Sequence, residues 1–174
     1  MKTTMKKTFG LLFLIFWLGQ SMVCQTSPTS LPTQYLQFYQ KAKQFSAQGN
    51  ANGAIEACLS AINYLEFANP EHRILMADLY FDIAQLEVEV VRQLKAIQKG
   101  LVALCRNYES RNFYEHPPLE QVVYPKKVLG FINLKIYLLF HYWKSTRGDA
   151  KFLNYALKSC HFADHLISLS LIHI

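Results

Sequence analysis

The sequence predicts an all-α protein in which antiparallel helix hairpins repeat along the chain. Apolar residues recur at steps of three and four, which is the spacing of one face of a helix. No stretch of about four to eight residues keeps the alternation of a strand for long, and β-branched residues are sparse. Small residues also recur at an offset of 42 positions, which indicates internal repetition.

The amino terminus has the layout of a secretory signal peptide. Three lysines precede an uncharged run of ten residues, Phe9 to Leu18, and a more polar stretch follows. A membrane-crossing helix needs ~20 apolar residues, so cleavage is favoured over retention as an anchor. We therefore expect residues 1–24 to be a signal peptide helix and residues 25–33 a linker. The mature protein is then exported, either periplasmic or secreted.

The cleavage point has two readings. Gly19 and Ser21 are small and suit a cut after Ser21, whereas a cut after Cys24 leaves Gln25 first, which resembles exported proteins of the Bacteroidetes. A lipid-modified Cys24 is disfavoured, because that signal has Leu three residues before the cysteine and a small residue directly before it. This chain has Ser21 and Val23 there.

Charge and cysteine content exclude several classes of function. The formal net charge is +6, and three signal-peptide lysines contribute half of it, so about +3 remains on the mature part. A charge that small is not the footprint of a nucleic-acid-binding protein. The mature part has three cysteines, Cys58, Cys105 and Cys160, which are odd in number and lack the spacing of a zinc site. One disulfide between two of them is an alternative in an oxidising compartment.

The first hairpin is expected to join a helix around Tyr35–Phe45 to a helix around Ile55–Leu65. Gly49-Asn50 ends the first helix, and Asn52 can cap the second. The second hairpin starts at Asn69-Pro70-Glu71, where Asn69 can cap, proline needs no N–H and glutamate suits the helix dipole. Its apolar faces run from Leu75 to Leu86 and, after a break near Glu89, from Leu94 to Leu104.

An insertion then precedes the third hairpin. Residues 106–127 are polar and aromatic, and Pro117, Pro118 and Pro125 preclude one long helix there. An aromatic helix is expected at roughly Val128–Ser145. The turn at Gly148-Asp149 leads into a last helix near Ala150–Ser168.

Alanines mark the predicted helix crossings, because helices approach to ~8–10 Å where the side chains are small. Ala42, Ala54 and Ala61 return 42 residues later, and the insertion stretches the offset of the third copy to 60. The predicted repeat positions are Phe38, Ala42, Phe45, Ala54, Ala61, Tyr80, Ala84, Ala96, Ala103, Ala156 and Ala163.

Residues 34–68, above all FYQKAKQFSAQGNANGAIEACLSAIN, resemble a tetratricopeptide repeat. Residues 71–105 resemble a second copy and 128–166 a third, with a period longer than the ~34 residues of the common form. The second copy departs most, since Glu87 stands where the first has Phe45 and the Gly-Asn turn is missing.

The resemblance implies an α-solenoid over residues 34–168 that acts as a non-catalytic interaction scaffold. Such a stack would offer a concave groove to a protein or peptide partner, with no cofactor and no metal. Exported proteins of this kind often continue into a caspase-like peptidase domain or a membrane signalling module. The alternative is therefore the amino-terminal repeat array of a larger enzyme or sensor.

The last six residues, LSLIHI at 169–174, resemble the translation of a transposon end used in sequencing libraries. No polar capping helix, which repeat arrays require, is evident before them. We therefore expect a non-native tail at 169–174 and a natural chain that continues past about Ser168. An ordinary apolar helix end is the alternative.

Candidate chemical groups are few, and we expect no catalytic residue. His161 and His165 stand four apart, but Phe162 occupies the place where a zinc metalloprotease has its glutamate. His116 and Cys105 would make a nucleophile pair only if folding brought them together.

The insertion supplies the candidate partner-binding residues, because Tyr and Arg are favoured at interfaces and insertions in repeat arrays map to one face. The alternative is that its aromatic residues cover the third hairpin. We expect a protein or peptide partner, no nucleic acid, and membrane contact only through an uncleaved signal segment. The candidate residues are Arg106, Tyr108, Arg111, Phe113, Tyr114 and Tyr124.

Overall fold

The computed structural model describes residues 31–110, 112, 114–146 and 148–172, the last four without their side chains. The predicted signal peptide and most of the predicted linker lie outside the described residues. The described residues, from 31 onward, belong to one compact unit.

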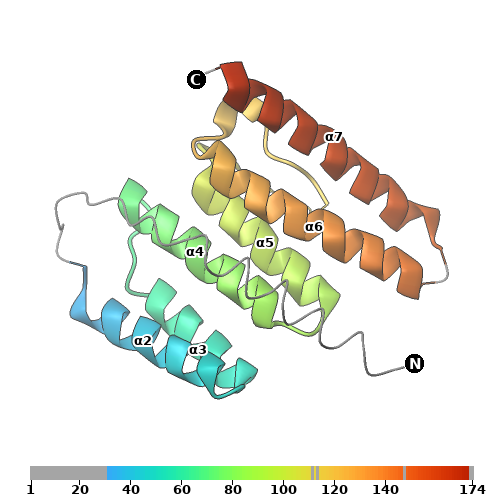
Figure 1. Ribbon diagram of the computed structural model, residues 1–174. Coiled ribbons are helices and arrows are strands. Elements are labelled where there is room, and N and C mark those ends of the chain that lie inside the picture. Colours follow the sequence, from blue (N-terminus) through green and yellow to red (C-terminus); the bar gives the residue numbers. More distant parts are fainter. Residues whose placement is uncertain (1–30, 111, 113, 147, 173–174) are drawn as a thin grey trace. The chain divides into compact units, whose positions relative to one another are not determined.

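The described part of the chain is all-α, as predicted. Figure 1 shows three successive helix hairpins: α2 (Thr33–Ala47) with α3 (Ala51–Ile62), α4 (Pro70–Leu86) with α5 (Val90–Leu104), and α6 (Pro125–Ser145) with α7 (Ala150–Ile172). The insertion contains a short 3-10 turn, η1 (Leu119–Gln121), and one isolated antiparallel bridge between Cys105 and Val122. No described helix has the length and apolarity of a membrane-crossing segment.

The hairpins stack in chain order. Within each hairpin the two helices pack along their length, and neighbouring hairpins meet through α3 with α4 and through α5 with α6. The first helices also lie side by side. Lys43 on α2 pairs with Asp82 on α4 at 3.4 Å, and Asp78 on α4 pairs with Lys127 on α6 at 2.5 Å. Exposed ion pairs contribute little stability, so they indicate the arrangement more than they hold it.

Local sequence explains where the helices start. The Asn69 side chain accepts hydrogen bonds from the backbone N–H groups of Glu71 (2.9 Å) and His72 (3.5 Å), so the predicted cap is confirmed. The cap predicted for α3 is wrong: Asn50 accepts from Gly53 N–H at 3.0 Å, and Asn52 lies inside the helix. Gly49 adopts φ +73° and ends α2, which leaves Asn50 in the non-helical conformation that a cap needs.

The third hairpin also departs from the expected bounds. Helix α6 begins at Pro125, three residues before the predicted start at Val128. Proline at the first helical position loses no hydrogen bond, so Pro125, one of the three prolines that preclude a single long helix across the insertion, can begin α6. Helix α7 runs to Ile172 rather than Ser168.

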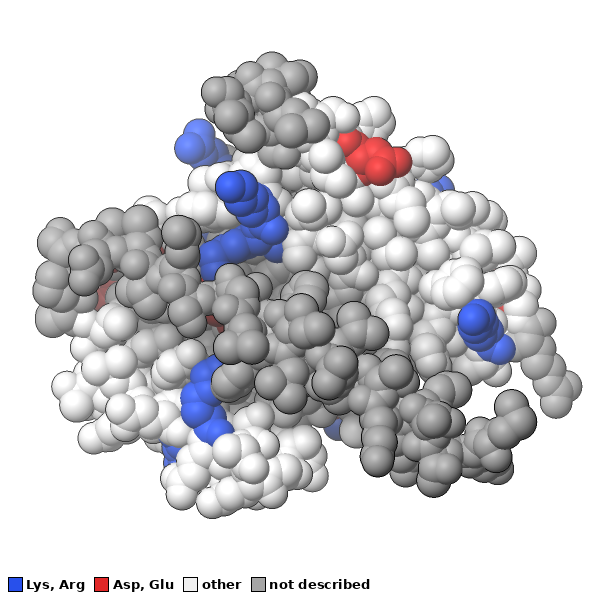
Figure 2. Space-filling view, viewed as in Figure 1, with Lys and Arg blue, Asp and Glu red and all other residues white. Residues whose placement is uncertain are grey.

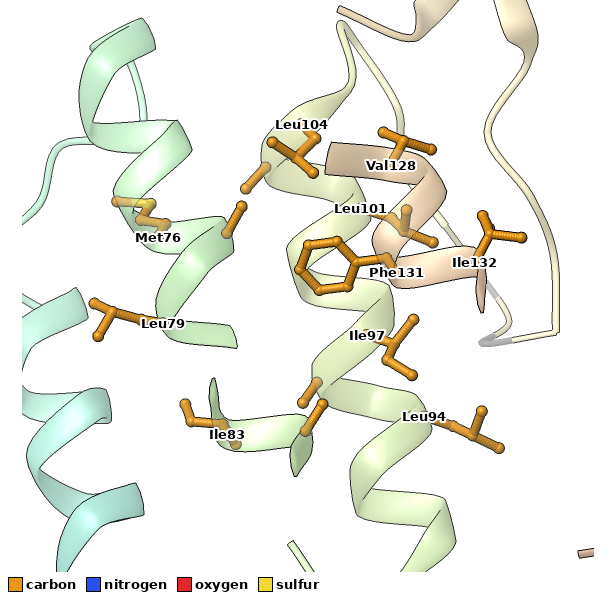
Figure 3. Close-up of a cluster of buried hydrophobic side chains, with 14 of the residues drawn as sticks. Met76, Leu79, Ile83, Leu94, Ile97, Leu101, Leu104, Val128, Phe131 and Ile132 are labelled. Carbon is orange, nitrogen blue, oxygen red and sulfur yellow. The ribbon is translucent and has the colours of Figure 1, made fainter. Parts of the chain in front are cut away.

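The core lies between the hairpins (Figure 3). Leu79 and Ile83 of α4 point toward the first hairpin, whereas Ile97 and Leu101 of α5 point toward α6. The ring of Phe131 on α6 lies against Gly100 of α5. Full burial of each such side chain contributes roughly 1.5–3 kcal/mol. The alanines at the repeat positions are 0–7% exposed, whereas the three aromatic repeat positions are half-buried.

Candidate partner-binding site

The structure places the insertion residues unequally. Arg106 is exposed, Tyr108 is only 8% exposed, and Tyr114 and Tyr124 are half-buried. Tyr124 lies directly before α6. Arg111 and Phe113 lie outside the described residues. Of the four described candidates, only Arg106 is therefore exposed.

Aromatic stacking holds the insertion against α7. The ring of Tyr114 stacks on that of Tyr155 with centroids 4.1 Å apart and lies 6.3 Å from Phe152. The ring of His116 stacks on that of Phe162 at 5.0 Å. These contacts favour, for Tyr114, the alternative that the insertion's aromatic residues cover the third hairpin.

A buried polar cluster reinforces this attachment. The fully buried Lys135 of α6 donates from Nζ to the Glu115 carbonyl oxygen at 2.8 Å. His116 Nε2 lies 2.9 Å from the hydroxyl of Ser159, which itself donates to the Tyr155 carbonyl oxygen. Since that hydroxyl proton is used, we assign the imidazole proton to Nε2, which donates to Ser159.

Burial sets the protonation of these groups. Together with the smaller influence of the nearby charges of Lys135 and Lys158, it lowers the pKa of His116 to about 3. Burial also lowers the pKa of Lys135 to about 7, against the opposing influence of Glu115. Sequence reasoning did not single out Lys135 or Ser159. The sequence pattern could have predicted that Lys135 is buried, because this lysine falls on the apolar face of α6, between Ile132 and Leu139.

The cluster has the features of a structural tether. Ser159 is fully buried and bonded back to its own helix, so its hydroxyl is not presented to a substrate. The thiol of Cys105 is buried, and burial raises its pKa to about 12 despite the nearby Arg73, which keeps it protonated and unreactive. Within the described residues, no group of three His, Cys, Asp or Glu side chains could hold a metal ion.

A pocket of about 350 Å³ lies between hairpin two and the start of the insertion. Met76 lines its α4 side, and Phe67, 53% exposed, lies on the segment that leads from α3 to α4. The Lys99 ammonium lies 5.6 Å from the centroid of the Tyr80 ring. The residues that line the pocket are Phe67, Met76, Tyr80, Gln98, Lys99, Val102, Ala103 and Ser110.

Two sets of polar contacts fix the pocket walls. Gln98 Nε2 donates to the carbonyl oxygen of Ser110 at 3.2 Å and to its hydroxyl at 2.5 Å, which holds the insertion against α5. Arg73 donates to the carbonyl oxygens of Ala103 (2.9 Å), Val102 (3.2 Å) and Cys105, and so caps the end of α5. The guanidinium lies 4.8 Å from the Phe67 ring, which fixes that wall.

The pocket includes one residue of the insertion, and the sequence alone did not predict it. Ser110 belongs to the predicted binding segment, but its neighbours in the pocket come from α4, α5 and the segment before α4. Only the fold brings these segments together. Figure 2 shows that Lys and Arg side chains are scattered over the described part of the visible face, without one continuous basic area.

No protein-family model, no curated protein and no solved structure matches the chain. The coarse architecture, an all-α stack of three helix hairpins, therefore rests on the structure itself. The tetratricopeptide resemblance of residues 34–68 stays a sequence-based prediction.

Proposed function

We propose that the chain is a non-catalytic interaction scaffold of the tetratricopeptide repeat type that binds a protein or peptide partner. The observation that carries the proposal is the pocket between α4, α5 and the insertion. It is mainly apolar, with a few convergent polar groups from Gln98, Lys99 and Ser110, which is the composition of a recognition site. The amino-terminal pattern of residues 1–24 adds the proposal that the chain is exported.

The pocket suits one large apolar side chain of a partner. Met76 at the buried side adapts to the shape of an incoming group, and Phe67 at the rim supplies a rigid aromatic wall. Such an anchor would hold a short linear segment. The same binding role applies to the alternative proposal, in which the chain is the amino-terminal array of a larger enzyme or sensor.

Selection of peptides tests the proposal. The purified chain would be screened against a displayed library of random peptides, and the affinity of the selected peptides measured by fluorescence anisotropy. We expect enriched peptides to share one large apolar residue. Phe67→Ala should weaken binding about tenfold, as expected for an aromatic anchor.

The matched control is Leu59→Ala, because Leu59 is 42% exposed on α3 and does not line the pocket. Circular dichroism would verify that both variants fold. If no sequence is enriched, the scaffold function is rejected. If peptides are enriched but bind the Phe67 variant as tightly as the parent chain, the pocket is rejected as their site.

A further inference from the structure

A row of exposed side chains runs along the second half of α6. Tyr137, Phe140, His141 and Lys144 stand at i, i+3, i+4 and i+7, so they share one face of the helix. Tyr137 is 48% exposed and Phe140 is 43% exposed, and His141 and Lys144 are exposed as well. We call these four residues the α6 stripe.

The side chains of the α6 stripe contact one another in two pairs. The rings of Tyr137 and His141 lie 5.8 Å apart, and the Lys144 ammonium lies 5.1 Å from the centroid of the Phe140 ring. The half-buried Trp143 supports Phe140 from the side at 5.2 Å. The stripe is therefore two contacting pairs in one row along the helix, with a cation at one end, and not a set of scattered apolar residues.

The neighbouring first helix is different. The exposed positions of α4 include Glu71, Asp78 and Gln85, none of them apolar. On α2, Leu36 is exposed to 43%, and Lys41 lies 5.6 Å from the Phe45 ring, but Phe45 is half-buried. Among these first helices, α6 thus presents its aromatic rings most openly to solvent.

Charge is also concentrated on the third hairpin. Residues 125–168 hold seven basic and two acidic residues, a formal +5, whereas residues 31–124 hold eight basic and ten acidic residues, a formal −2. Two of the lysines are engaged, since Lys135 is buried and Lys127 pairs with Asp78. The lysines at 126, 144, 151 and 158 remain exposed, so this hairpin favours an acidic partner.

We propose that the α6 stripe docks an acidic peptide segment of the partner protein, with apolar side chains on the rings of Tyr137 and Phe140 and carboxylates toward Lys144. The inference rests on the proposed function and adds the charge of the partner and a second contact surface. One turn of helix separates the rings, a rise of about 4.5 Å. The docked segment therefore carries two apolar residues at a matching interval, flanked by Asp or Glu.

The shape of the stripe favours a peptide over a lipid surface. Its rings stand in single file along one helix, which matches one extended or helical segment. A membrane-binding helix needs a broad apolar face, with rows of basic residues beside it.

Binding of synthetic peptides to the full chain tests the inference. The probe is a fluorescein-labelled peptide with two leucines one helical turn apart among glutamates, and its partner probe replaces each glutamate by glutamine. We expect the glutamate peptide to bind about tenfold more tightly, and less tightly as salt rises. Phe140→Ala and Lys144→Glu should each weaken its binding about tenfold.

Leu36→Ala and Lys41→Glu on α2 are the matched controls and should leave binding unchanged. As a second measurement, Tyr137→benzoyl-phenylalanine should cross-link the glutamate peptide on illumination. Equal affinity for the two probes, or full affinity in the α6 variants, overturns the inference.

Two further outcomes separate this inference from the scaffold function. If random peptides are enriched and the α6 variants bind them normally, the scaffold function stands and the α6 site falls. If instead vesicles of equal phosphatidylglycerol and phosphatidylethanolamine bind the chain through Phe140 and the glutamate peptide does not, the acidic-peptide site is overturned in favour of a lipid surface.

Discussion

Helices α5 and α7 occupy the same place in successive hairpins but face different surroundings. Each helix carries two buried alanines where it crosses the first helix of its own hairpin. Ala96 and Ala103 of α5 correspond to Ala156 and Ala163 of α7, 60 positions later. The opposite faces diverge. Ile97, Leu101 and Leu104 of α5 are at most 1% exposed, whereas the residues 60 positions later are all exposed. Those residues are Leu157, His161 and Asp164.

The difference shows that packing within a hairpin and packing between hairpins depend on different residues. Small residues inside the hairpin allow its two helices to cross closely, so they recur in both helices. Apolar residues on the outer face are needed only where another hairpin packs, as α6 packs on α5. Helix α7 holds the exposed Leu157, His161 and Asp164 instead, so this face is open to solvent in the described part of the chain.

Exchanging the outer-face residues tests the comparison most strongly. Leu104→Asp introduces at position 104 the residue type that α7 has at position 164. Because Leu104 is 0% exposed, the new carboxylate is buried without a partner and should lower the free energy of unfolding by roughly 4 kcal/mol or more. The reverse exchange, Asp164→Leu, should change stability by less than ~0.5 kcal/mol. Urea unfolding measures both. Similar costs for the two variants would show that this face of α7 is not exposed to solvent.

Sequence patterns predicted the parts of the fold that depend on neighbours along the chain. Helical spacing and the Asn69 cap belong to this class. The cap of α3 was misplaced because Asn50 and Asn52 both suit the role, and only the φ of Gly49 decides between them.

The candidate site depends on contacts between segments that are distant in sequence. His116 meets Ser159 across 43 residues, and Lys135 meets Glu115 across 20. The pocket joins Phe67 to Ser110 in the same way. Spacing along a single sequence carries no information about such pairs. The sequence therefore predicted that residues 106–127 form an insertion, but it did not predict which residues attach the insertion to the helices.

A smaller change at the same pair of helices sharpens the comparison. A Cβ at Gly100 of α5 would overlap the Phe131 ring, so Gly100→Ala should cost about 1–3 kcal/mol through overpacking. Helix propensity alone would instead favour alanine by up to about 1 kcal/mol. At the matching position of α7, the exposed Cys160 should accept Ala with a change below ~0.5 kcal/mol. Thermal unfolding of the two variants checks the pair, and a stabilised Gly100 variant would contradict the packing.

The attachment of the insertion to α7 should depend on pH because it includes His116, whereas the hydrogen bonds between Gln98 of α5 and Ser110 involve no titratable side chain. The His116 pKa is about 3 in the folded protein and its ordinary value is 6.5, so between these pH values the unfolded chain binds more protons. Stability is therefore fully present above pH ~6.5 and falls as the pH drops toward 3, by about 1–2 kcal/mol at pH 4 after solvent screening. Lys135 and Lys158 add to the effect, since both repel the imidazolium.

His116→Gln isolates this contribution. The glutamine amide can still donate to Ser159 but does not titrate, so the decrease in melting temperature between pH 7 and pH 4 should become shallower. An equal decrease in the parent chain and the variant would assign the pH dependence to other groups.

The smallest effect concerns a second glycine, which precedes in sequence the residue that contacts Gly100. Gly130 lies on α6, next to Phe131, and a Cβ there would meet no atom within 4 Å. Gly130→Ala should therefore stabilise the protein by about 0.5–1 kcal/mol, because alanine lowers the entropy of the unfolded chain and favours the helix. Opposite signs for Gly100→Ala and Gly130→Ala in urea unfolding would show that contact with the Phe131 ring, and not helix propensity, requires glycine at position 100. A loss of stability in both would mean that α6 lies closer to its neighbours than its packing against α5 indicates.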